Sequence, residues 1–191
     1  TRFHAAPSFD EEPIFLCLEG PTDVEFFRRI TPILRASDAS LPDIGNDPRI
    51  APFPLGGNTL KDWVNKRYLR ELGKPEVHIY DSDVKYKDAC ASVNAREDGS
   101  WACQTSKREI ENYLHAEAIA EVFGVSIAVT DTSDVEQDLA TALGGQTRFK
   151  RRPLKRVLTE DVTPKMTIAG LKSRGGYAEI VDWYRRIGTM L

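Results

Sequence analysis

Four short segments rich in apolar residues alternate with longer stretches of mixed polarity over the first two thirds of the chain. The first of them is a continuous apolar run bounded by proline and glycine, which is typical of a strand covered on both faces. The second contains two prolines, which predict a short strand or one at a sheet edge. The four predicted strands lie within residues 13–18, 50–55, 75–83 and 100–106.

The stretches between the predicted strands have the spacing of amphipathic helices. We expect a helix from Thr22, with Pro32 near its end, and a second helix that Asn58 or Thr59 caps. A third helix is expected over 107–124, closed by a glycine. The alternation predicts an α/β fold, with a mostly parallel four-stranded sheet and helices on both of its faces.

The pattern changes to helices and loops beyond residue 125. We expect three further helices there, over 133–143, 153–160 and 177–190. The chain is therefore predicted to comprise a flexible lead-in, an α/β core and a helical C-terminal extension, with the bounds 1–12, 13–124 and 125–191.

Composition narrows the class of protein. A net charge of -3 over 191 residues argues against a uniformly basic nucleic-acid coat, although it is compatible with a local basic patch. Three scattered cysteines without a C-x-x-C pair predict reduced thiols, and hence a cytoplasmic protein, instead of a disulfide framework or a zinc site. No segment approaches the roughly 20 apolar residues of a membrane span, and no signal peptide is visible.

Acidic residues follow three of the predicted strands. The carboxyl ends of parallel strands meet at one edge of a sheet, where ligands of open α/β sheets bind. Asp23 lies about one helical turn beyond the first of these acids and is expected to face the same crevice. The acids that follow strands are Glu19, Asp81, Asp83, Glu109 and Glu111.

Several carboxylates at one place need a proton or a cation. Two like charges about 4 Å apart repel by roughly 4 kcal/mol at an effective dielectric constant near 20. Oxygen ligands without histidine or cysteine favour Mg²⁺, Mn²⁺ or Ca²⁺ over zinc. Each acidic motif alone is more often a strand–loop junction or a helix cap, but their succession after separate strands favours a metal site.

These residues carry a resemblance to a known family. "FLCLEGPTDVEFF" (15–27) and "HIYDSD" (78–83) resemble the Toprim domain, whose pattern is E-G-x-x-D after a strand and a later D-x-D. "FPLGGNTLKDW" (53–63) and "SKREIENYL" (106–114) are similar to the Toprim nuclease module of the OLD (overcoming lysogenisation defect) family of anti-phage ATP-dependent endonucleases. The detailed likeness covers residues 13–123 and implies a Rossmann-like Toprim fold.

The resemblance also implies an activity, which is hydrolysis of DNA phosphodiester bonds by a nuclease or nickase that uses two Mg²⁺ or Mn²⁺ ions. It casts Glu19 as a metal ligand or general acid/base, and Asp81 and Asp83 as the main metal ligands. Asp23 and Glu111 become ligands at a second metal position, with Glu109 a competitor for that role. Family members also use a downstream lysine near the scissile phosphate, for which Lys155 is the first choice and Lys150 the second.

DNA and an ATPase are the partners that this reading implies. OLD-family chains carry an ABC-type ATPase before the Toprim part, but no Walker A motif is present here. We therefore expect the ATPase on a preceding segment, since the chain begins at Thr1 without a methionine, or on another protein. A basic stretch could track the DNA backbone, although such runs are as often solvated surface; its candidate residues are Arg148, Lys150, Arg151, Arg152, Lys155 and Arg156.

Other interpretations stay open at this point. One is a Toprim module that binds nucleic acid or a partner without catalysis, and another is a phosphate-handling, phosphatase-like α/β protein, which "DSDVKYK" (81–87) resembles only faintly. Homodimerisation through the amphipathic segment 177–191 is a further hypothesis. His78 lies within an apolar strand, where a packed or hydrogen-bonded histidine is more common than a ligand.

Overall fold

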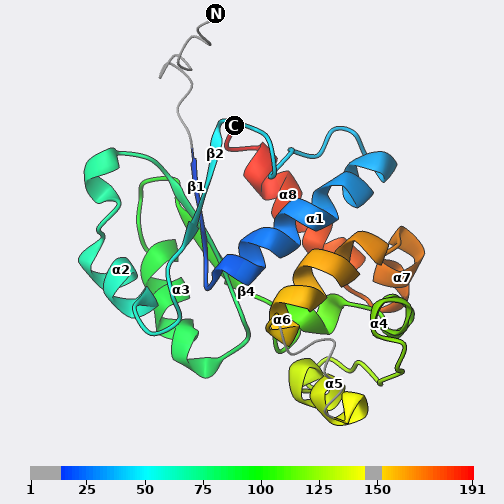
Figure 1. The fold of residues 1–191 in the computed structure, drawn as a ribbon. Helices are drawn as coiled ribbons and strands as arrows, with labels where there is room; N and C mark the ends of the chain where they lie inside the picture. The colour runs from blue at the N-terminus through cyan, green and yellow to red at the C-terminus, as the bar shows by residue number, and fades with distance from the viewer. Residues whose placement is uncertain (1–13, 145–151) are drawn as a thin grey trace, which may run out of the picture.

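A four-stranded parallel sheet lies at the centre of the computed structural model, which describes residues 14–144 and 152–191 (Figure 1). All three strand pairs are parallel, and the order across the sheet is β2-β1-β3-β4. Strand β2, which contains two prolines, lies at an edge of the sheet. Proline has no N–H donor, and at an edge this lack does not interrupt the hydrogen bonds between the central strands. The predicted α/β class is thus confirmed, with the strands β1 Ile14–Leu18, β2 Ile50–Pro54, β3 Glu76–Tyr80 and β4 Trp101–Gln104.

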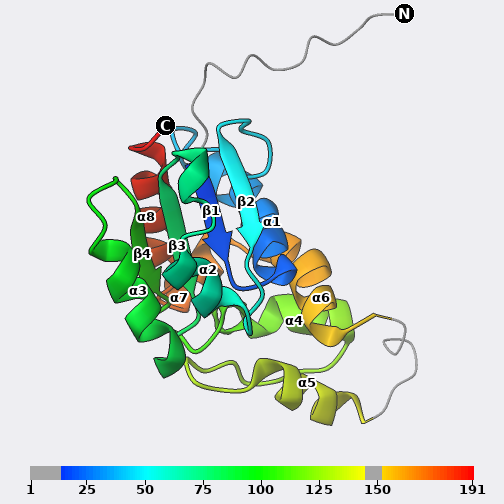
Figure 2. The same cartoon turned by 90° about the vertical axis from the view of Figure 1, so that its left-hand side faces the viewer.

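Helices cover both faces of this sheet (Figures 1 and 2). Side chains of β1 alternate, so that Ile14, Leu16 and Leu18 face one core and Phe15 and Cys17 face the other. The smaller core is covered by α2 (Leu60–Lys66) and α3 (Lys87–Asn94). The larger core is covered by α1 (Pro21–Ser37), α4 (Ala116–Phe123), α5 (Val135–Leu143), α6 (Leu154–Val157), α7 (Ile168–Ser173) and α8 (Tyr177–Gly188).

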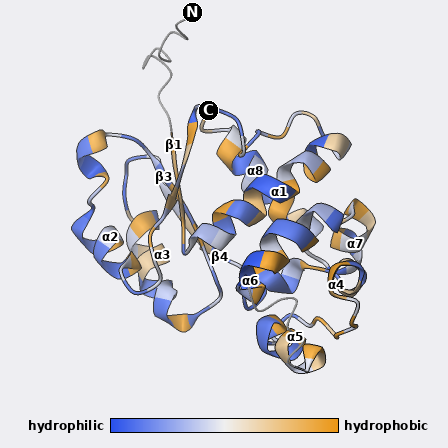
Figure 3. Ribbon diagram, viewed as in Figure 1, coloured by the Kyte–Doolittle hydropathy of each residue, from blue (hydrophilic) through white to orange (hydrophobic). Residues whose placement is uncertain are grey.

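Short turns complete the chain between these elements. Strand β1 is hydrophobic throughout, whereas the helices mix both kinds of residue because only one side of each faces a core (Figure 3). A π-helical segment, η5 (Leu158–Val162), continues α6. The other short helical segments in the described part of the chain are 3₁₀ helices. They are η1 (Arg70–Leu72), η2 (Val84–Tyr86), η3 (Ile110–Tyr113) and η6 (Thr163–Lys165).

Helix α1 agrees with the prediction, because it contains Pro32 near its end and runs on to Ser37. A proline inside a helix removes one backbone bond and crowds the preceding turn. Two hydroxyl groups support that turn: Thr31 Oγ1 donates to the Phe27 carbonyl at 2.7 Å, and Tyr184 Oη donates to the same oxygen at 3.0 Å. The Tyr184 hydroxyl comes from α8, which is distant in sequence, so the local pattern contains no signal for this support.

The predicted helix over 107–124 was wrong in its first half. A loop and the 3₁₀ turn η3 precede α4, which begins at Ala116 and ends before Gly124 as expected. Asn112 fixes the alternative path, because its side chain accepts from Glu109 N at 3.0 Å and donates to the carbonyls of Thr130 and Ser133 at 2.8 and 2.9 Å. Buried polar side chains that bind a neighbouring loop outweigh local helix propensity here.

The helices beyond residue 125 share the larger core with the strands. Leu158, Leu171 and Trp183 belong to the same buried cluster as Leu16 and Phe27. Within the described residues, one continuous apolar core therefore joins the predicted extension to the sheet, and the helices of the extension form part of the layer on one face. Within the two described ranges, no helix has both the length and the apolarity to cross a bilayer.

Asn112→Ala tests whether the hydrogen bonds of the Asn112 side chain fix the course of the backbone over residues 107–115. The substitution leaves a buried N–H and two carbonyls without their partners, which we expect to cost about 1–3 kcal/mol in the free energy of unfolding. Urea denaturation measures the loss. Asn65→Ala, at an exposed position of α2, is the matched control and should change stability by less than about 0.5 kcal/mol. Equal effects of the two substitutions would contradict the assignment.

Candidate metal centre

Four of the five acids that follow the strands, all but Glu111, line one cavity at the carboxyl edge of the sheet. The cavity has a volume of about 270 Å³. It receives side chains from the ends of β1 and β3, from the loop after β4, and from α6. Its lining residues are Glu19, Asp81, Ser82, Asp83, Lys85, Tyr86, Arg108, Glu109 and Lys155. The structure thus brings together acids that lie up to 90 residues apart in the chain.

Backbone hydrogen bonds fix the segments that carry these acids. Gly56 N donates to the Glu19 carbonyl at 2.9 Å, so the chain after β2 runs beside the end of β1. Gln104 Nε2 donates to the carbonyls of Asp81 and Asp83 at 3.0 and 2.7 Å. Because β4 holds the loop after β3 in this way, the D-x-D segment has a defined place at the sheet edge.

Two further acids, Asp23 and Glu111, lie deeper than the cavity lining. Asp23 is 5% exposed and accepts a hydrogen bond from Gly20 N at 2.8 Å, at the start of α1. Glu111 is 2% exposed, and neither of its carboxylate oxygens has a hydrogen bond within the described part of the chain. A buried carboxylate without hydrogen bonds is costly unless a proton or a cation compensates its charge.

Lys155 supplies positive charge to this cluster. Its Nζ lies 3.5 Å from Glu109 Oε2 and 3.5 Å from Glu111 Oε1. Although burial alone would lower the pKa of Lys155, the charges of Glu111 and Asp23 raise it above its ordinary value. Lys155 therefore keeps its charge at the cavity wall. Lys150, the second choice from the sequence, falls outside the described residues.

Three of the acids hold protons more tightly than usual. Burial raises the pKa of Asp23 to about 6 and that of Glu111 to about 7. Burial, followed by the charges of Asp23 and Glu111, raises the pKa of Asp81 to about 8. Asp83, in contrast, is exposed, and hydrogen bonds from Lys85 lower its pKa. The site is thus short of positive charge on its buried side.

The donor set suits a hard divalent cation, but its spacing is wide. Carboxylate oxygens are the ligands that Mg²⁺ and Mn²⁺ prefer, and the raised pKa values of Asp81 and Glu111 reflect burial first and the neighbouring carboxylates second. Its carboxylates do not, however, form a group of three with ligand atoms within 4.8 Å of one another. Binding one ion to three acids therefore requires their side chains to move closer together.

A different cluster among the described residues does meet that spacing, namely Cys17, Glu76 and His78. His78 Nε2 lies 2.7 Å from Glu76 Oε2, and its Nδ1 is hydrogen-bonded to the Tyr80 hydroxyl. The buried guanidinium of Arg96 also lies 3.0 Å from Glu76. Because the carboxylate and the imidazole already have partners, we interpret the cluster as a hydrogen-bonded network, which agrees with the expectation for His78.

The basic stretch is partly neutralised where the structure describes it. Arg152 pairs with Asp161 at 2.8 Å and also with Glu160, which Arg156 contacts as well. Ion-paired guanidinium groups attract phosphate less than free ones do. The other predicted DNA contacts, Arg148, Lys150 and Arg151, fall outside the described residues.

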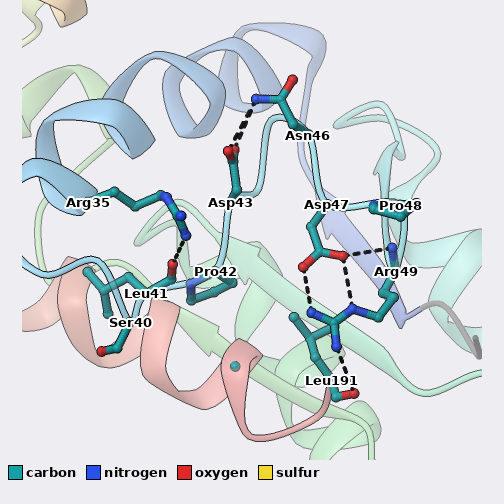
Figure 4. A pocket seen from close by; sticks show the side chains of 11 residues that line it. Arg35, Ser40, Leu41, Pro42, Asp43, Asn46, Asp47, Pro48, Arg49 and Leu191 are labelled. Carbon is teal, nitrogen blue, oxygen red and sulfur yellow. Dashed lines mark hydrogen bonds and ion pairs between the residues drawn. The ribbon is translucent and has the colours of Figure 1, made fainter.

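A larger cavity, of about 600 Å³, lies near the opposite edge of the sheet (Figure 4). Arg35, Asp43, Asp47 and Arg49 are among its lining residues. Its charged groups have partners nearby, since Arg49 Nη2 lies 2.8 Å from Asp47 Oδ2 and Arg35 donates to the Leu41 carbonyl. It contains none of the predicted site residues, and size alone does not make it the better candidate.

Some residues of the acidic cavity were not predicted from the sequence. Tyr86, Lys85 and Arg108 line it, and Gly57 lies against Glu19. Lys85 and Tyr86 follow D-x-D, while Gly57 and Arg108 lie within the stretches 53–63 and 106–114 that carry the family resemblance, but no pattern there marks either residue for the site. Comparison of the chain with protein-family models, with curated proteins and with solved structures found no match.

The raised pKa values predict how stability depends on pH. A carboxyl whose pKa rises from 3.8 unfolded to about 8 folded contributes stability below pH 4 that is lost as the pH rises toward 8. Asp81→Asn removes this loss. In metal-free buffer, the stability of the variant relative to wild type should therefore be greater at pH 8.5 than at pH 5. The gain should be about 1 kcal/mol or more, because one pKa unit corresponds to about 1.4 kcal/mol.

Urea denaturation at the two pH values in EDTA measures this gain. Asp88→Asn, at an exposed position of α3, is the control and should show a much smaller difference between them. If the stability gain of Asp81→Asn between the two pH values were no greater than that of the control, the proposed excess of negative charge at the site would be refuted.

Proposed function

We propose that this chain is a divalent-metal-dependent DNA nuclease or nickase of the Toprim type, the nuclease part of an OLD-like system. The observation that carries the proposal is the convergence of Glu19, Asp81 and Asp83 on one cavity at the carboxyl ends of parallel strands. This arrangement agrees with the Toprim resemblance of the same residues. Two divalent ions bound there would polarise a phosphodiester and supply a nucleophilic water at neutral pH.

The chain's own residues then have distinct roles. Asp81 and Asp83, held by Gln104, would bind the ions from the β3 side, while Glu19 binds from β1 or moves a proton. Asp23 and Glu111 lie behind the cavity and compensate further positive charge there. Glu111 suits this inner position better than Glu109, because Glu111 is 2% exposed, whereas Glu109 is one-third exposed and pairs with Arg108 as well as with Lys155.

Lys155 is suited to bind the scissile phosphate. Its ammonium lies at the cavity wall and is 31% exposed, so it can contact both the acids and a ligand. A fixed positive charge at this place stabilises the charge that develops on phosphate oxygens during hydrolysis. It also offsets the repulsion between the acids and the DNA backbone.

The direct test of the proposal is metal-dependent cleavage of supercoiled plasmid DNA. Wild-type protein with Mg²⁺ or Mn²⁺ should nick or linearise the plasmid, and excess EDTA should abolish the reaction. Asp81→Asn should lower the rate by about 100-fold or more, since it removes a charged ligand. Asp88→Asn controls for charge removal at the surface and should cleave like wild type.

The alternatives give different results in the same assay. A non-catalytic module would bind DNA in Ca²⁺ without cleaving it in Mg²⁺ or Mn²⁺. A phosphatase-like protein would hydrolyse p-nitrophenyl phosphate and leave DNA intact. Cleavage that persists in EDTA, or that Asp81→Asn leaves at the wild-type rate, would show that the nuclease proposal is wrong.

Lys155→Met tests the role of the lysine. The variant keeps most of the side-chain volume and loses the charge, so we expect kcat to fall by about 10- to 1,000-fold with a smaller effect on KM. Single-turnover cleavage of a short duplex measures the chemical step. Lys172→Met, on α7, is the control. An unchanged kcat would remove Lys155 from the mechanism.

A further inference from the structure

The Glu19 carboxylate lies against the backbone of Gly57. A Cβ atom built on Gly57 would be 2.7 Å from Glu19 Oε1, closer than real Cβ contacts allow. The same Cβ would be 3.2 Å from the Tyr86 hydroxyl. The carboxylate and the hydroxyl therefore approach one spot on the backbone, which only a residue without a side chain leaves open.

Space, and not backbone conformation, accounts for glycine at this position. The preceding Gly56 has a φ of 73°, which L residues rarely adopt, whereas Gly57 is not in the left-handed region. Other residues could take the Gly57 backbone conformation. What they could not do is leave the Glu19 carboxylate in its place.

Tyr86 presents a buried hydroxyl at the same spot. The residue is 1% exposed, and its hydroxyl has no well-formed hydrogen bond among the described residues, although the Glu19 carboxylate and the Lys85 ammonium lie beside it. A buried hydroxyl without a partner is unfavourable, and the Glu19 carboxylate is the acceptor that shares its surroundings.

Tyr86 is also tied to the acid on the other strand. Asp83 Oδ1 accepts from Lys85 N at 3.0 Å, which starts the turn η2 that carries Tyr86. Lys85 Nζ lies 3.1 Å from Asp83 Oδ2 and 4.5 Å from the centre of the Tyr86 ring. The turn therefore links Tyr86, which lies beside Glu19 at the end of β1, to Asp83 in the loop after β3.

We propose that Tyr86 and Gly57 form a seat for Glu19, in which the Tyr86 hydroxyl donates to the carboxylate and Gly57 leaves the room that it occupies. The seat fixes the direction from which Glu19 reaches a divalent cation in the cavity. Tyr86 is thus a positioning residue that acts through Glu19. The inference rests on the proposed metal-dependent function and assigns to it residues that the acidic motifs do not contain.

Mn²⁺ binding, followed by the electron paramagnetic resonance of the free ion, tests the seat without any need for turnover. Tyr86→Phe keeps the ring and removes the donor, and Gly57→Ala fills the room. Each should weaken Mn²⁺ binding by about 10-fold or more, as loss of a group that orients a metal ligand does. Gly57→Ala should remain folded, because the atom that must move is the end of a flexible side chain.

Two control substitutions match these changes away from the site. Tyr184→Phe removes a buried hydroxyl that pairs with Thr31 in the larger core. Gly45→Ala adds a methyl group in ordinary contact, 3.5 Å from Asp43 Oδ1. Both controls should bind Mn²⁺ like wild type, and circular dichroism should show that all four variants are folded.

A double-mutant cycle separates positioning from a general structural effect. If the seat acts through Glu19, adding Tyr86→Phe or Gly57→Ala to Glu19→Ala should weaken the remaining Mn²⁺ binding no further. If Glu19→Ala leaves no measurable Mn²⁺ binding, the proposal is decided by comparing the Mn²⁺ affinities of Tyr86→Phe and Gly57→Ala with those of their controls. Wild-type Mn²⁺ affinity in both seat variants would overturn the seat alone, whereas wild-type protein that neither binds Mn²⁺ nor cleaves DNA would overturn the proposed function as well.

Discussion

Repulsion between carboxylates at the carboxyl edge of the sheet is the constraint on which the site depends. The parallel topology brings Glu19 and Asp81 to the same edge, and burial places Asp23 and Glu111 just behind them. Four negative charges in so small and poorly solvated a region would oppose folding if nothing compensated them. Raised pKa values at the three buried acids, and the Lys155 ammonium among them, show how the chain limits this cost.

The same constraint explains why the cluster of Cys17, Glu76 and His78 differs from the acidic cavity at the sheet edge. Glu76 is buried as deeply as Asp23, but Arg96 and His78 pair with it directly. Those pairs lower the pKa of Glu76 in spite of its burial. Its charge is thus compensated within the fold, whereas the three buried acids of the edge cluster, Asp23, Asp81 and Glu111, share the Lys155 ammonium. An added cation has more to contribute at the edge than within the sheet.

The sequence predicted those features that short-range patterns encode. Apolar runs gave the four strands, their alternation with helices gave the parallel sheet, and acids after strands gave the members of one cavity. Long-range contacts decided the rest: α1 passes Pro32 with support from Tyr184, and the path around Asn112 depends on the Thr130–Ser133 loop. The approach of Gly57 to Glu19 likewise has no local signal, because it depends on how two loops meet.

Anomalous diffraction from crystals soaked in Mn²⁺ would locate a bound ion without reference to activity. We expect one or two Mn²⁺ peaks in the cavity between Glu19 and the Asp81 and Asp83 carboxylates, with these side chains drawn closer than in the metal-free protein. A peak at Cys17, Glu76 and His78 with none in that cavity, or an acidic cavity that stays free of metal at millimolar Mn²⁺, would contradict this expectation.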